Sequence, residues 1–190
     1  MPAFQELVQV ALARKADHAA IVRTDQIRFV PEFRKACEQD TCRKYGSNWM
    51  CPPGVGPMEE LRAQAQSFPQ GLFLQTVHPV ASSFDLKAMY AAKHDHDPIF
   101  RDILAYFQER PAFTRLLALD AGACELCPRC TYLDDRAPCR FPDLAIPAVE
   151  AYGIDVINLE KAAGIPYYHG PKAISYVGLI LFEAGVDPAP

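Results

Sequence analysis

The chain has 190 residues, of which 50% are hydrophobic and 22% are charged. This length and composition suit one domain over residues 1–190 with a single sizeable core. The formal net charge is −4, and no run of Lys and Arg occurs. The sequence therefore argues against a nucleic-acid-binding protein, which needs a clustered positive face.

The sequence shows no targeting or membrane signal. Residues 1–17 alternate apolar and charged side chains, and they lack the basic start, unbroken apolar stretch and cleavage site of a signal peptide. The most apolar segment elsewhere, 174–182, is too short for a bilayer, which takes about 20 residues. We predict a cytoplasmic protein that binds no membrane.

Hydrophobic periodicity predicts helices and strands in alternation along the chain. Helices are expected at 5–15, from Met58 onward, over 85–110 with a break at Pro98, and as two short pieces at 147–152 and 155–163. Strands are expected at 20–22 and 27–30, joined by a hairpin turn, and at 71–77 and 174–183. This pattern predicts an α+β fold, an α/β sandwich whose sheet of about four strands has flanking helices. Residues 187–190 are expected to form a disordered tail.

Seven cysteines form the unusual feature of the composition. A reducing compartment rarely supports disulfides, so clustered cysteines there bind metal or carry out redox chemistry more often. The seven fall into two groups, three between residues 37 and 51 and four between residues 124 and 139. Both groups lie in segments without helical or strand periodicity, so we expect two cysteine-rich ligand loops.

The second group begins with a C-x2-C-x2-C run formed by Cys124, Cys127 and Cys130, with Cys139 nine positions later. Three thiolates at this spacing can wrap one centre, and the fourth completes the ligand set of a [4Fe–4S] cluster. The run matches the first part of the bacterial ferredoxin motif, in which the fourth cysteine follows after three residues. In two-cluster ferredoxins that fourth cysteine binds the other cluster. Cys139 is therefore either the fourth ligand of this cluster or a ligand of a second one.

Zinc is the alternative metal for this group. Structural zinc usually takes two C-x2-C pairs a dozen or more residues apart. Consecutive x2 spacings place the middle cysteine awkwardly for a tetrahedron. We therefore favour an iron–sulfur cluster, with zinc and a metal-free loop as the alternatives.

The first group consists of Cys37, Cys42 and Cys51. Three thiolates leave a metal centre one ligand short, and an open coordination position is what Lewis-acid chemistry requires. Basic and aromatic residues accompany them: Arg34, Arg43, Lys44, Tyr45 and Trp49. We expect the basic residues to lower the thiol pKa values and the aromatic ones to shield the site from water. The plainer interpretation is three buried structural cysteines.

The chain resembles a family of predicted metal-binding proteins, a domain of unknown function common in anaerobic bacteria and archaea. The matching pieces are Tyr45-Gly46-x-x-Trp49-x-Cys51-Pro52-Pro53, Cys124-x2-Cys127-x2-Cys130, and Cys139-Arg140-x-Pro142 with the continuation 147–156. The resemblance runs from about residue 19 to residue 182. At position 148 the chain has Ala where the family has Ser, so no hydroxyl role is carried over. The resemblance implies a cysteine-bound metal centre and supplies no substrate.

Histidines contribute little to this interpretation. His94 and His96 are two positions apart, so on a helix they point to different sides and do not form a metal-ligand pair. His169 precedes the last strand and is a candidate fourth ligand or proton donor for the three-cysteine site. Glu150 is expected to be a helix first-turn acid.

Two functions from different classes fit these residues. The first is electron transfer by one [4Fe–4S] cluster, or two, with a redox partner protein. The second is an enzyme that uses the open three-cysteine centre on a small-molecule or sulfur substrate. A structural zinc protein is the weaker alternative. The sequence does not decide between enzyme and carrier, and it does not predict an oligomeric state.

Overall fold

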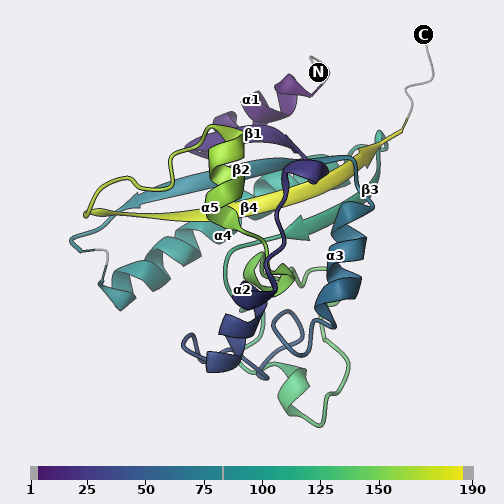
Figure 1. Ribbon diagram of the computed structural model, residues 1–190, viewed down its shortest axis with the longest axis vertical. Helices are drawn as coiled ribbons and strands as arrows, with labels where there is room; N and C mark the ends of the chain where they lie inside the picture. The colour runs from purple at the N-terminus through teal and green to yellow at the C-terminus, as the bar shows by residue number, and fades with distance from the viewer. Residues whose placement is uncertain (1–3, 83, 186–190) are drawn as a thin grey trace.

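The computed structural model describes residues 4–82 and 84–185. Its centre is a four-stranded antiparallel sheet in the order β1-β2-β4-β3 (Figure 1). The strands are β1 (His18–Arg23), β2 (Gln70–Pro79), β3 (Phe113–Leu119) and β4 (Ala173–Ala184). The predicted α+β fold with about four strands is confirmed. The predicted disordered tail, 187–190, lies outside the described residues.

Helices cover both faces of the sheet (Figure 1). On one face, α1 (Gln5–Ala13) and α4 (Leu86–Gln108) enclose a core with the sheet residues Leu72, Leu74 and Ile180. On the other face, α3 (Met58–Gln66) and α5 (Val156–Ala163) enclose a second core with Phe73, Leu179 and Leu181. The short helix α2 (Pro31–Ala36) leads into the first cysteine group.

The expected break at Pro98 is wrong, because α4 is continuous through that residue. Proline costs a helix one backbone hydrogen bond and introduces a steric conflict. The following turns bury Phe100, Ile103 and Phe107 completely, and burial of each such side chain stabilises by about 1.5–3 kcal/mol. Packing against the sheet therefore outweighs the local preference of proline.

The expected hairpin at 20–30 is also wrong. β1 pairs with β2 instead, and a short 3₁₀ turn, Thr24–Gln26, follows it. Of the predicted second strand, Phe29 alone forms a bridge, to Ile154. The chain then enters α2 at Pro31, because proline is favoured in the first helical turn.

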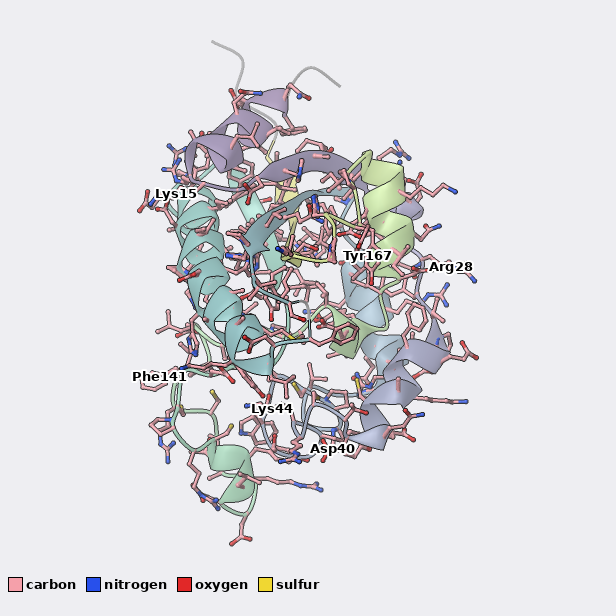
Figure 2. All side chains as sticks on the ribbon, turned by 90° about the vertical axis from the view of Figure 1, so that its left-hand side faces the viewer. Lys15, Arg28, Asp40, Lys44, Phe141 and Tyr167 are labelled. Carbon is pink, nitrogen blue, oxygen red and sulfur yellow. The ribbon has the colours of Figure 1, made fainter. Side chains whose placement is uncertain are left out.

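Both cysteine-rich segments lie at one end of the molecule. In Figure 1 they form the dark blue and green loops below the sheet, and in Figure 2 the labelled Asp40, Lys44 and Phe141 lie together at that end. Within residues 4–82 and 84–185, no helix is long and apolar enough to cross a membrane.

Candidate metal centre

The second cysteine group lies in a loop that is closed at its base. The loop leaves β3 at Asp120 and returns at Ala148, and these two residues form a parallel bridge. The backbone N–H of Asp120 donates to Pro147 at 3.0 Å, and that of Val149 donates to Asp120 at 2.9 Å. This clamp holds both ends of a long loop that has only one short 3₁₀ turn, Thr131–Leu133, as regular structure.

The loop brings Cys124, Cys127, Cys130 and Cys139 to one pocket. All four are free thiols, and each is partly buried. Apolar side chains supply much of the remaining wall: Trp49, Met50, Leu126, Phe141 and Ala145. Burial raises the pKa of the Cys124 thiol. The donor set is therefore four sulfurs around one largely apolar pocket, which suits a soft, thiolate-bound metal centre.

The first cysteine group follows α2 and is held by Arg34. The guanidinium of Arg34 donates to the carbonyl of Ala151, and at 2.7 Å to that of Gly56. It thereby joins both ends of the segment to the turn before α5. Cys37 is partly buried, Cys42 is exposed and Cys51 is buried. Besides burial, negative charge on Cys42 or Cys37 raises the pKa of the Cys51 thiol.

The expected lowering of thiol pKa values by basic residues does not occur at Cys37 or Cys51. Burial raises the pKa of Cys37, and the positive charge of Arg34 only partly offsets this effect. Burial raises the pKa of Cys51 to about 11, although the neighbouring side chain of Asn48 acts in the opposite direction. Without a bound cation both side chains are therefore neutral thiols at neutral pH.

The two cysteine groups pack against each other. Lys44 donates to Glu125 at 3.0 Å, and the indole N–H of Trp49 donates to the carbonyl of Ala137, also at 3.0 Å. Trp49 was expected to shield the three-cysteine group, but it lines the four-cysteine pocket instead. Since the chain continues from Met50, in the wall of that pocket, directly to Cys51, the two groups are neighbours.

Among the described residues, no three Cys, His, Asp or Glu side chains stand close enough together to hold a single metal ion. The four thiols face a shared pocket without meeting at one point. Ligation by either cysteine group therefore stays a prediction.

A buried polar network next to these groups was missed by the sequence analysis. His96, on α4, is fully buried; its ring shares hydrogen bonds with Thr76 at 2.7 Å and Asp120 at 2.9 Å. Lys93 pairs with Asp97 and, at 3.3 Å, with Asp120. Burial alone would raise the pKa of Asp120, but His96 and Lys93 hold it below its usual range. The i, i+3 spacing of Lys93 and His96 places both on one face of a helix, and this is the sequence pattern that could have indicated the network.

Two cavities open beside this network. One of about 610 Å³ lies between the first cysteine segment and α4, with Cys42, Lys44 and Lys93 in its wall. The other, of about 400 Å³, contains Glu150, and Tyr176 contributes to both. Glu150 is exposed to the cavity, yet the surrounding protein desolvates its carboxyl and raises its pKa.

His169 contacts other residues than the three cysteines for which it was considered as a fourth ligand or proton donor. Its ring shares a hydrogen bond with Gln75 at 2.9 Å and stacks on His18. Gln75 also donates to Glu160 at 2.7 Å. His169 therefore belongs to a polar cluster at the sheet.

Comparison with known proteins agrees with the cysteine pattern. No curated protein and no solved structure matches the chain. The profile of a family described as predicted metal-binding protein, DUF2284, matches residues 20–182, which include all seven cysteines. The chain therefore belongs to the DUF2284 family of predicted metal-binding proteins.

Proposed function

We propose that this protein is a cytoplasmic iron–sulfur protein that transfers electrons. Cys124, Cys127, Cys130 and Cys139 hold a [4Fe–4S] cluster, and the three cysteines of the first group hold a second metal centre. The observation that carries the proposal is that four free thiols line one pocket with apolar walls.

The surroundings of the pocket support a redox role. A [4Fe–4S] cluster supplies one-electron transfer, at a potential set by hydrogen bonds, charge and solvent exposure. Trp49, Met50 and Phe141 limit the access of water to the thiols. The first cysteine group adjoins the same wall, so an electron has a short path between the two centres. A redox partner protein docks at this end of the molecule, where Cys42 is exposed.

Electron paramagnetic resonance of anaerobically purified protein tests the proposal. Dithionite reduction of the wild type should produce the signal of a reduced [4Fe–4S] cluster, and Cys127→Ser should remove it. Cys42→Ser is the matched control, because it changes a thiol of the other group and should leave this signal in place. A redox-silent wild type that contains zinc would overturn the proposal.

A second candidate function is an enzyme in which the three-cysteine centre keeps one open coordination position. The observation that favours it is the cavity of about 610 Å³ with Cys42 in its wall. Cyanide is a suitable probe, because it binds an iron that has a free position. Cyanide should change a spectroscopic signal that Cys42→Ser abolishes. Without such a change, the carrier function alone remains.

A further inference from the structure

The cavity of about 610 Å³ has two chemically different walls. Leu86, Met89 and Tyr90 form one wall along α4, at the i, i+3, i+4 spacing of a single helix face. Leu86 and Tyr90 are 68% and 54% exposed, so the chain leaves much of their apolar surface uncovered. The volume lies within the range of about 300–1,000 Å³ that is typical of small-molecule sites.

Basic residues line the rest of the cavity: Lys93 continues the α4 wall beyond Tyr90, and Arg43 and Lys44 belong to the first cysteine segment on the other side. Arg43, Lys44 and Lys93 line the cavity, whereas Glu125 is its one acidic lining residue. Lys93 is also bonded to Asp97 and Asp120, which do not line the cavity, so its charge is already compensated. Glu125 is paired with Lys44, so among the described lining residues Arg43 is the cation left without an ion pair and free to meet an anionic ligand.

Lys93 is held in place for such a contact. Its ammonium bonds to Asp97 and Asp120, and His96 fixes Asp120 from the far side. A lysine ammonium has three N–H groups, so one remains for a partner in the cavity. The side chain of Lys93 is only 11% exposed, and a charge-assisted hydrogen bond is stronger in such surroundings than in water.

We propose that this cavity binds a small organic carboxylate with an apolar body. Lys93 and Arg43 bind the carboxylate, and Leu86, Met89 and Tyr90 cover the apolar part. The site extends the proposed function, because Cys42 lines the cavity beside Arg43 and Lys44. Binding of the carboxylate does not itself require a metal. Asp120 and His96 act as positioning residues for Lys93.

Fluorine NMR with two matched probes tests the proposal on the anaerobically purified full-length protein. para-Fluorobenzoate carries the charge, and para-fluorobenzamide has nearly the same shape without it. The wild type should bind the benzoate at least about tenfold more tightly than the amide, as expected for a lost charge-assisted hydrogen bond. Equal affinities, or no binding of the benzoate, would overturn the proposal without any variant being needed.

Three variants locate the site. Lys93→Met should weaken benzoate binding about tenfold or more and leave amide binding unchanged. Lys87→Met is the matched control, because Lys87 is exposed on the same helix and does not line the cavity. Tyr90→Ala should weaken both probes. Benzoate binding that survives Lys93→Met in full would place the carboxylate elsewhere and contradict the proposal.

Iron content is measured on the same samples. A wild type that binds the benzoate but contains no iron would contradict the proposed electron transfer and leave the carboxylate site standing. A wild type that contains iron but does not bind the benzoate would contradict the carboxylate site alone.

Discussion

Lys44 and Glu125 are 81 positions apart in the chain, and the ammonium of Lys44 donates to the carboxylate of Glu125 at 3.0 Å. Lys44 lies between Cys42 and Cys51, and Glu125 lies next to Cys124. The ion pair therefore bridges the two cysteine groups. Both partners also line the large cavity, so the contact that joins the two cysteine segments also forms part of the cavity wall.

This bridge should contribute modestly to stability. A double-mutant cycle with Lys44→Met and Glu125→Gln should give a coupling free energy of about 0.2–1 kcal/mol, because the side chains retain 34% and 29% exposure. Urea denaturation of the four proteins measures it. The control cycle pairs Lys44→Met with Asp143→Asn, an exposed acid, and should give no coupling. A Lys44–Glu125 coupling no larger than that of the control would contradict the prediction.

The Asp120 network should contribute far more. Asp120→Ala removes the acceptor of buried His96 and one partner of Lys93. Loss of one partner in a buried ion pair typically costs about 3–5 kcal/mol. We expect a decrease of this size in the free energy of unfolding, measured by urea denaturation. Asp143→Ala serves as the control and should change stability by about 0.5 kcal/mol or less. A loss below about 1 kcal/mol for Asp120→Ala would mean that the network is not a structural anchor.

Gly178 allows α4 to pack closely on the sheet. A Cβ atom at this position would overlap the ring of Phe100, which is fully buried. Gly178→Ala should therefore destabilise the protein by about 1–3 kcal/mol, the usual cost of overpacking. Thermal unfolding measures the change.

A second substitution separates steric overlap from backbone effects. Phe100→Leu alone should destabilise, but in the Gly178→Ala background it should cost less, because the smaller side chain relieves the overlap. Strictly additive losses would contradict the proposed cause. Gly185→Ala is the control on the chain next to β4, since its added Cβ would meet nothing closer than 3.3 Å.

Glu160 should make stability depend on pH. Burial raises its pKa to about 7 from the ordinary value of 4.5, although Gln75 donates a hydrogen bond to it. Between these values the folded chain holds a proton that the unfolded chain has released, so stability falls as pH rises. Measured by urea denaturation, this loss should reach up to about 3 kcal/mol by neutral pH and be complete just above pH 7.

Glu160→Gln should remove this dependence, because the amide cannot ionise. The stability of the variant relative to the wild type should be greater at pH 8 than at pH 5. Glu59→Gln, an exposed acid on α3, should show no such difference and is the control. A variant whose relative stability is the same at both pH values would contradict the assignment to Glu160.

The sequence predicts β1, β2, β4 and most helices because their signals are local, but it misses β3 and places a strand at 27–30 where the structure has one isolated bridge. Asp155 caps α5, where its side chain accepts from the N–H of Asn158, and Gly164 ends it with a positive φ of 69°. Both residues are recognisable from the sequence alone. Pro98 misled the prediction because the packing that overrides it comes from residues distant in sequence, on β2 and β4.

The candidate site was predictable in part. Cysteine spacing identifies both groups, since ligand spacing is itself a local property. Their contact through Lys44 and Glu125, and the meeting of Asp120 with His96, depend on the tertiary fold. The pKa of Cys51 was misjudged for a related reason: basic neighbours in sequence are visible, whereas the burial that outweighs them is not.

The central claim is a [4Fe–4S] cluster on Cys124, Cys127, Cys130 and Cys139. Its most direct test is the content of iron, acid-labile sulfide and zinc per chain after anaerobic purification, for the wild type and for Cys127→Ala. The account predicts at least about four iron and four sulfide in the wild type, with about four of each lost in the variant. About one zinc per chain and no sulfide would contradict it.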